Sequence, residues 1–218
     1  MGSIGHAGSF SFQLSKLMTA GEGGCCTTND AELSDRIFRA SHIGKSLQNP
    51  GVPLETGLIC HQYRFTEFQA VIIYDQLQHQ KELQAKRAAN AALLREYMKD
   101  IPGIKMQSSA GLNDERAYYF LTFLLDTSRL KPGMDRAWIY KALRAEGVLF
   151  HEGWGCPLYK SPAWNIPENM FIKHDTSVCE DVMYNRAVIG SNTLLLTDTP
   201  VIENIAECFR KVLNGAMQ

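Results

Sequence analysis

Long hydrophobic runs are absent from this chain of 218 residues. No segment approaches the roughly 18 uninterrupted apolar residues of a membrane span, so the sequence predicts no transmembrane helix. Residues 1–15 lack a basic stretch followed by an apolar one, which predicts no signal peptide. Internal repeats and low-complexity tracts are also missing, so a repeat architecture is not expected.

An excess of charge of either sign is absent too. The chain has 22 Lys and Arg against 23 Asp and Glu, a net charge of -1. This balance gives no electrostatic reason to expect binding to nucleic acid or to an anionic membrane. With 45% hydrophobic and 21% charged residues, the composition is typical of a globular protein with one large domain or two small ones.

Cysteine pairs with redox or metal-binding spacing are not found. The six cysteines form no Cys-x-x-Cys motif, which predicts reduced thiols in a cytoplasmic protein. The adjacent Cys25 and Cys26 are interpreted as packing residues. The six histidines have no metal-ligand spacing to cysteines or carboxylates, so no metal site is expected.

Hydrophobic periodicity predicts strands alternating with helices, which favours an α/β or α+β fold. Strands are expected at 9–13, 25–28, 117–125, 148–150 and 192–196, and helices at 30–44, 66–101, 134–147 and 199–213. Loops rich in Gly and Pro are expected at 44–64 and 152–170. Gly147 is expected just beyond the end of its helix.

Three helix starts carry capping signals. Thr66 with Gln69 and Ser177 with Glu180 have capping-box spacing. Thr199 followed by Pro200 predicts an N-cap with proline at the first helical position.

The segment 66–101 lacks Pro and Gly and carries two apolar stripes, so it predicts two helices or one long bent helix. The stripes comprise Phe68, Ile72, Ile73 and Leu77, then Ala91, Leu94, Met98 and Ile101. Pro102 and Gly103 end the pattern. We therefore expect two parts, residues 1–101 and 102–218. The most regular stripe lies in the final helix and comprises Ile202, Ile205, Ala206, Phe209, Val212 and Leu213.

Lys16 lies just past the predicted strand 9–13, and Ser11 lies five residues before it. Strand ends are where α/β proteins place reactive groups. A lysine amine can form a Schiff base with an aldehyde, and a nearby hydroxyl with free backbone N–H groups suits a phosphate. Aldehyde and phosphate together describe pyridoxal phosphate. The residues leave a second interpretation open, in which Lys16 is an ordinary surface charge.

The stretch GSFSFQLSKLMTAGEGGCCTTNDAEL resembles the lysine motif of the DegT/StrS family of sugar and cyclitol aminotransferases. A second block, HQYRFTEFQAVIIYDQL, is similar to the family's Asn-Tyr-Arg segment and the helix that follows it. The resemblance extends over essentially all 218 residues. It implies an α/β fold, namely the C-terminal portion of a fold-type-I aminotransferase that depends on pyridoxal 5'-phosphate. Residues 1–101 would be a remnant of the large cofactor-binding domain with long helices. Residues 102–218 would be a small α+β domain.

The resemblance also implies roles for single residues. Lys16 corresponds to the Schiff-base lysine, which also moves the proton during transamination. Ser11 corresponds to the serine that bonds the cofactor phosphate, and Gln13 lies where a residue near the cofactor is expected. Family members with histidine in place of the lysine dehydrate sugars, so Lys16 favours the transaminating branch. The residues of the lysine motif are most similar to those of the cyclitol and aminohydroxybenzoate members of the family.

The second block implies an active site at a dimer interface. In the family its asparagine reaches the phosphate of the neighbouring subunit, and here that position is Gln62, one methylene longer. Tyr63 and Arg64 are open to two interpretations, an interface-packing pair or ligand-binding residues.

The resemblance begins in the middle of the family's pattern. The aspartate that pairs with the pyridinium nitrogen belongs to the family's first half, and residues 1–15 contain no Asp or Glu. The expected partner is therefore a second copy of the chain or the missing N-terminal half. The expected function is transfer of an amino group from glutamine or glutamate to a keto-sugar or keto-cyclitol. The alternative is a non-catalytic truncated homologue that folds as an oligomer or interaction domain.

Overall fold

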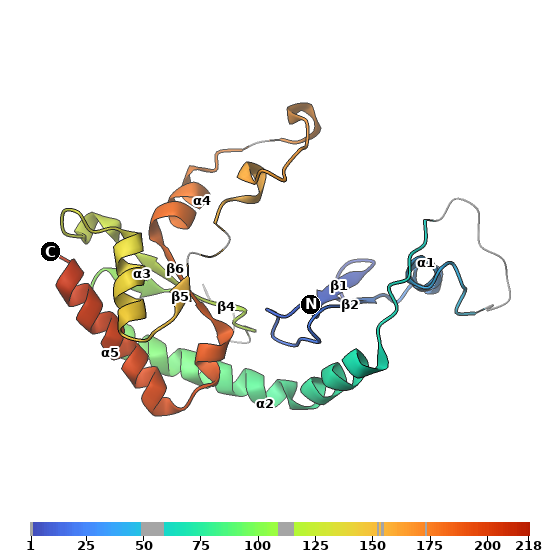
Figure 1. Cartoon of the computed structure of the whole chain (residues 1–218), viewed down its shortest axis with the longest axis horizontal. Coiled ribbons are helices and arrows are strands. Elements are labelled where there is room, and N and C mark those ends of the chain that lie inside the picture. The colour runs from blue at the N-terminus through green and yellow to red at the C-terminus, as the bar shows by residue number, and fades with distance from the viewer. Residues whose placement is uncertain (1, 49–58, 109–115, 152, 154, 173) are drawn as a thin grey trace. The chain divides into compact units, whose positions relative to one another are not determined.

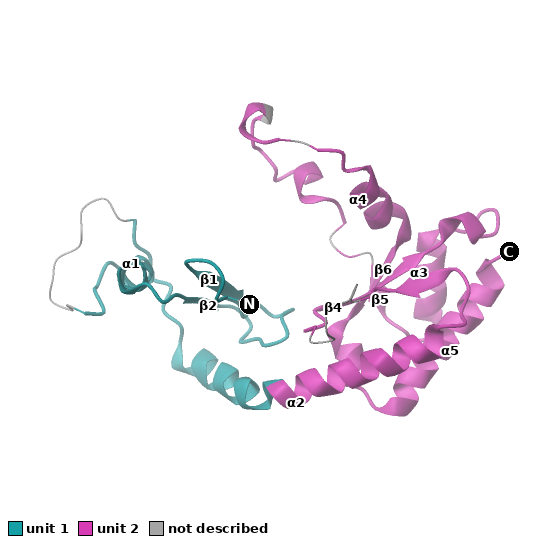
Figure 2. Ribbon diagram, turned by 180° about the vertical axis from the view of Figure 1, so that it is seen from behind, with its two compact units in different colours: residues 1–80 teal, residues 81–218 magenta. Residues whose placement is uncertain are grey.

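The computed structural model describes residues 2–48, 59–108, 116–151, 153, 155–172 and 174–218 (Figure 1). The chain divides into two compact units, residues 1–80 and 81–218 (Figure 2). The functional division expected at residues 101 and 102 stays a prediction, because compactness does not reveal which part binds a cofactor.

The first unit contains a two-stranded antiparallel sheet, a short helix and the beginning of a long helix: β1 (Gly8–Ser11), β2 (Gly24–Thr27), α1 (Ala31–Ser41) and α2 (Glu67–Met98). Asp30 caps α1 by accepting a hydrogen bond from the backbone of Leu33 at 3.0 Å. The segment 66–101 forms one continuous helix rather than two. Its capping box is confirmed, since Thr66 Oγ1 accepts from Gln69 N at 3.3 Å and Thr66 N donates to Gln69 Oε1 at 3.1 Å.

The second unit is built on a four-stranded antiparallel sheet with the order β3-β4-β6-β5. Its strands and helices are β3 (Ile104–Met106), β4 (Phe120–Leu125), α3 (Arg136–Ala145), β5 (Phe150–His151), α4 (Ser177–Asp181), β6 (Ala187–Ser191) and α5 (Thr199–Ala216). Gly147 lies two residues beyond α3 with φ +87°, as expected for a residue after a helix end.

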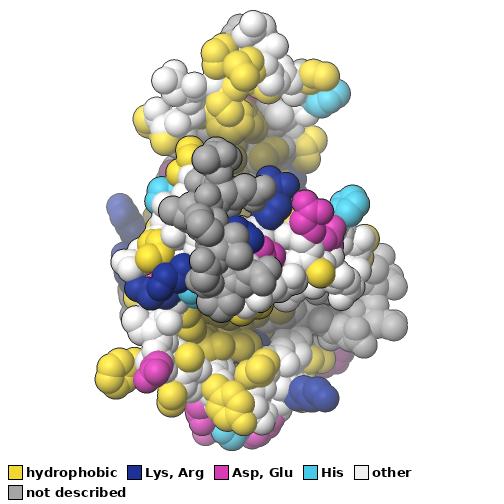
Figure 3. Space-filling model, turned by 90° about the vertical axis from the view of Figure 1, so that its right-hand side faces the viewer, with side chains coloured by type: hydrophobic (Ala, Val, Ile, Leu, Met, Phe, Trp, Pro, Cys, Tyr) yellow, Lys and Arg dark blue, Asp and Glu magenta, His cyan; other side chains and the backbone are white. Residues whose placement is uncertain are grey.

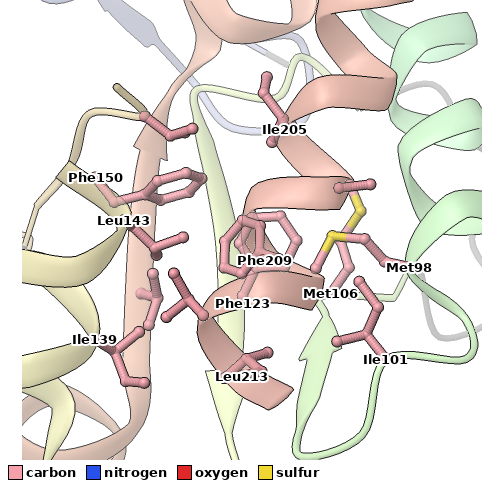
Figure 4. Packing of buried hydrophobic residues seen from close by; sticks show 14 of the residues in the cluster. Met98, Ile101, Met106, Phe123, Ile139, Leu143, Phe150, Ile205, Phe209 and Leu213 are labelled. Atoms are coloured by element: carbon pink, nitrogen blue, oxygen red, sulfur yellow. The ribbon is translucent and has the colours of Figure 1, made fainter. Parts of the chain in front are cut away.

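The hydrophobic core belongs to the second unit and is formed by the sheet with α3, α5 and the second half of α2. Phe123, Phe150 and Phe209 point toward one another (Figure 4), with ring centroids 4.9 to 5.7 Å apart. Every residue of the predicted α5 stripe is buried, as is the second stripe of 66–101. Patterning at helical spacing therefore identified the core helices correctly.

The first stripe of 66–101 behaves differently. Phe68 is 86% exposed, and Ile72 and Leu77 are exposed as well. Figure 3 shows hydrophobic side chains in several separate groups at the surface. The predicted strand at 9–13 is present as β1, but its alternating pattern does not mark a buried face, because β1 contains no buried residue. Cys25 and Cys26 are also exposed, so their interpretation as packing residues was wrong.

The predicted strand at 192–196 was wrong. Residues Asn192–Leu196 form a 3₁₀ helix, in which Ser191 Oγ accepts a hydrogen bond from Thr193 N at 3.3 Å. The strand lies just before it, as β6, and the sequence interpretation missed both β6 and β3. A serine that caps a following turn can override an apolar run of strand-like composition.

Two helix starts differ from expectation. The N-cap of α5 is Asp198, one residue before the predicted Thr199. The capping box at Ser177 was wrong, because α4 follows Thr176 and the Glu180 carboxylate instead accepts hydrogen bonds from Lys160, Tyr159 and Thr176. The expected loops at 44–64 and 152–170 lie partly outside the described residues.

Within the ranges that the structure describes, no helix combines the length and apolar character that a membrane span requires. Those ranges also hold no group of three or more His, Cys, Asp or Glu side chains placed to bind a metal ion.

Candidate functional site around Lys16

Lys16 lies in the loop 12–23 that joins β1 to β2, a segment we call the lysine loop. Two backbone hydrogen bonds of Phe12 close the loop. Phe12 N donates to Gly23 O at 2.8 Å, and Ala20 N donates to Phe12 O at 2.9 Å. A Cβ on Gly23 would lie 2.4 Å from the ring of Phe65, so the glycine lets the loop backbone approach that ring.

The predicted site residues Ser11, Gln13 and Lys16 share one tight turn. Gln13 N donates to Ser11 Oγ at 3.3 Å, and Lys16 N donates to Gln13 O at 2.9 Å. The side-chain oxygen of Gln13 accepts from Ser15 N and Ser15 Oγ at 2.8 and 2.7 Å. Side chains that bond to nearby backbone groups stabilise such turns. Ser11 is exposed and Lys16 is half-buried.

Gln62 lies in a segment paired with the end of α1. His61 N donates to Ala40 O at 2.7 Å, and Tyr63 N donates to Ser41 O at 2.9 Å. Gln62 is exposed, and the rings of His61 and Tyr63 stack with centroids 4.8 Å apart. An exposed Gln62 is available to a second protein chain, but its predicted contact with a neighbouring subunit's cofactor stays a prediction.

Two glutamines of α2 contact the lysine loop. Gln76 bonds both backbone groups of Thr19, and Gln69 donates to Glu22 O at 2.8 Å. The sequence interpretation used Gln69 only as a capping residue and missed Gln76 and Thr19. The seven-residue spacing of the two glutamines places both on one face of a helix, but it gives no sign that Thr19 lies opposite that face.

The sequence matches the DegT/DnrJ/EryC1/StrS aminotransferase family over residues 1–208. A putative L-glutamine:3-amino-2,3-dideoxy-scyllo-inosose aminotransferase of Micromonospora echinospora is 34% identical over 150 residues, which are 69% of this chain and 35% of that protein. The L-glutamine:2-deoxy-scyllo-inosose aminotransferase of Streptomyces paromomycinus is 29% identical over 238 aligned positions, covering 100% of this chain and 55% of that protein.

Solved structures are similar over nearly the whole chain. The aminotransferase from Psychrobacter cryohalolentis has a TM-score of 0.82 at 24% identity, covering 99% of this chain and 57% of that one. The 3-amino-5-hydroxybenzoic acid synthase has a TM-score of 0.76 at 23% identity, covering 96% and 55%.

These likenesses confirm the expected fold, that of a part of a fold-type-I aminotransferase. The chain spans from about a third to just over half of the length of the curated relatives it matches. The family's sequence pattern includes the lysine loop, the segment around Gln62 and most of the second unit. This chain therefore belongs to the DegT/DnrJ/EryC1/StrS aminotransferase family.

Proposed function

We propose that the chain is part of an aminotransferase that depends on pyridoxal phosphate, with Lys16 as its Schiff-base lysine. The observation that carries the proposal is the turn in which Ser11, Gln13 and Lys16 lie together, inside a motif of an aminotransferase family. The amino group would move from glutamine or glutamate to a keto-cyclitol or keto-sugar.

The residues of the lysine loop fit the cofactor in their chemistry. Lys16 supplies an amine for the aldehyde, and the exposed residue Ser11 supplies a hydroxyl for the phosphate. The lysine loop contains one carboxylate, that of Glu22, whereas residues 2–21, which include Ser11, contain no Asp or Glu to repel a phosphate dianion. The same stretch offers no acid for the pyridine nitrogen. An acid for that nitrogen would therefore come from outside this stretch.

Each residue would have a distinct task. Ser11 would donate a hydrogen bond from its hydroxyl to a phosphate oxygen and fix that end of the cofactor. Lys16 holds the other end through Nζ and carries a proton at that atom. Gln13 fixes the turn through its bonds to Ser15. Bound there, the cofactor would supply an electron-accepting ring, which is chemistry that no side chain supplies.

The substrate class rests on the relatives. Two curated relatives are named for glutamine as amino donor and for scyllo-inosose derivatives as acceptor. Lys16 keeps the residue that transamination needs. We therefore place a keto-cyclitol before other keto-sugars as the acceptor, with glutamine as the donor.

The exposed apolar side chains near the start of α2 favour a homodimer. Phe68, Val71 and Tyr74 are 86%, 68% and 68% exposed. Exposed apolar patches of this kind commonly mark protein interfaces. Sedimentation of the purified chain should show a dimer that Val71→Glu converts to monomer, because burying an unpaired carboxylate is costly. A monomeric wild type would contradict the homodimer.

Transfer of labelled nitrogen tests the function. The purified chain, supplied with pyridoxal phosphate, glutamine labelled with ¹⁵N at its α-amino group and 2-deoxy-scyllo-inosose, should give a labelled aminocyclitol by mass spectrometry. Lys16→Arg keeps the charge but cannot form the Schiff base, so it should abolish the product. A folded wild-type chain that transfers no label would favour the non-catalytic alternative.

A further inference from the structure

We propose that Gln69 and Gln76 are positioning residues for Lys16, which hold the lysine loop against α2 so that the amine keeps its place. This inference rests on the proposed function of Lys16. Neither glutamine needs to contact a substrate or a cofactor. Their effect on Lys16 would pass through the backbone of the loop.

Gln76 binds the loop with both ends of its side-chain amide. Thr19 N donates to Gln76 Oε1 at 2.9 Å, and Gln76 Nε2 donates to Thr19 O at 2.7 Å. A single side chain thus bonds both backbone groups of one loop residue, as a neighbouring strand would. Both bonds are partly buried, where water competes less for the same groups.

Gln69 provides a second point of attachment two helical turns earlier. Its Nε2 donates to Glu22 O at 2.8 Å. Its Oε1 accepts from Thr66 N and Thr66 Oγ1 at 3.1 and 2.9 Å. The capping box therefore fixes the orientation of the Gln69 amide and directs its nitrogen to the loop.

Thr19 connects Gln76 to the turn that carries Lys16. Its Oγ1 donates to Phe12 O at 3.1 Å and accepts from Gly21 N at 3.0 Å. Phe12 directly precedes Gln13, whose backbone oxygen accepts from Lys16 N. A continuous set of hydrogen bonds and one peptide bond thus joins the Gln76 amide to the backbone of Lys16. Loss of Gln76 should loosen the end of the loop and the turn together.

Hydrogen exchange and chemical trapping together test the proposal. Gln76→Leu removes both bonds to Thr19. Gln78→Leu is the matched control, because Gln78 is an exposed glutamine of the same helix whose side chain has no hydrogen bond to the described residues. Gln76→Leu should raise exchange of the Thr19 amide by about tenfold, as expected for the loss of hydrogen bonds worth roughly 1.4 kcal/mol together. It should lower the initial rate at which borohydride fixes pyridoxal phosphate to Lys16 by a similar factor. Trapping at other lysines and the behaviour of Gln78→Leu should match wild type.

A purely structural role for Gln76 gives a different result. Faster Thr19 exchange with unchanged trapping at Lys16 would overturn the proposal. If wild type forms no adduct at Lys16, the proposed function fails instead. Acetylation of the Lys16 amine by acetic anhydride then replaces trapping as the readout, and an unchanged rate in Gln76→Leu would overturn the positioning role. Should Gln76→Leu not fold, Gln76→Asn keeps the amide one methylene shorter and should show the same two changes.

Discussion

Asn90 shows how much a single buried polar side chain contributes to the second unit. It lies on α2 and is only 7% exposed. Its Nδ2 donates to Leu195 O and Thr197 O, each at 2.9 Å. The two amide hydrogens thus satisfy two carbonyls at the end of the 3₁₀ helix before α5. Without them, those carbonyls would lie partly buried with no partner.

Asn90→Ala should lower the free energy of unfolding by about 1 to 3 kcal/mol, because it leaves these carbonyls unsatisfied. Urea unfolding followed by circular dichroism measures the change. Asn185→Ala is the control, since Asn185 is exposed and its side chain bonds only Asp181 Oδ1, at 3.0 Å, among the described residues. Equal small effects of the two substitutions would show that the Asn90 bonds add nothing.

At the level of single elements, the pairing of β5 with β6 depends on a glycine, which has no side chain. Gly190 lies opposite Phe150 in the antiparallel register. A Cβ on Gly190 would lie 2.7 Å from Phe150 Cε1, and that ring is 2% exposed within the aromatic cluster. The ring has no free space to move into, because Phe123 and Phe209 pack against it.

Gly190→Ala should therefore destabilise the chain by about 1 to 3 kcal/mol through overpacking. Gly215→Ala should have the opposite sign. Gly215 lies in α5 with nothing within 4 Å of an added Cβ, so alanine should stabilise by about 0.5 to 1 kcal/mol through helix propensity. The two midpoints of urea unfolding, compared with wild type, check both signs at once. A stabilising Gly190→Ala would refute the packing argument.

The Lys160–Glu180 ion pair ties the segment before α4 to that helix. Lys160 Nζ donates to Glu180 Oε2 at 2.5 Å, and Thr176 Oγ1 donates to Glu180 Oε1 at 3.0 Å. The bond from Lys160 has the largest effect and the bond from Thr176 the next largest, and both lower the pKa of Glu180 below its usual value. The bond to Glu180 raises the pKa of Lys160.

The two pKa shifts predict that the stability of this segment has an acidic and an alkaline limb in its pH dependence. The Glu180 contribution is complete above its unfolded pKa, about 4.3, and is lost as the pH falls through the lower folded value. The Lys160 contribution is complete below about 10.4 and is lost as the pH rises through the higher folded value. The protection of the Lys160 and Ser161 amides from hydrogen exchange, corrected for the intrinsic pH dependence of exchange, should fall at both extremes. Glu180→Gln should remove both limbs. An unchanged acid limb in that variant would contradict this assignment.

The success of sequence prediction differed between elements for physical reasons. The α5 stripe and the second half of α2 were predicted correctly, because their buried faces repeat at helical spacing. The strand at 192–196 failed, because the Ser191 side chain favours a turn there. The family motif identified Ser11, Gln13 and Lys16 as site residues, but it did not predict the turn that they share. The contact of Gln76 with Thr19 joins residues 57 positions apart, which no local pattern reveals.

At the scale of the whole molecule, the two units differ in how they are stabilised. The second unit contains the hydrophobic core, whereas β1, β2 and α1 contain no buried residue. The first unit instead relies on hydrogen bonds such as those of Gln69 and Gln76, together with the pairing of its two strands. The lysine loop therefore belongs to the part of the chain that would gain most from covering by a second protein.

The central claim is that the Lys16 amine forms the covalent link to pyridoxal phosphate. The most direct test incubates the purified chain with the cofactor, reduces with borohydride and locates the pyridoxyl group by mass spectrometry of a digest. Modification should be concentrated at Lys16 and should be lost in Lys16→Ala, with Lys45 as an internal comparison. Modification spread evenly over the lysines, or absent from Lys16 in the folded chain, would contradict the claim.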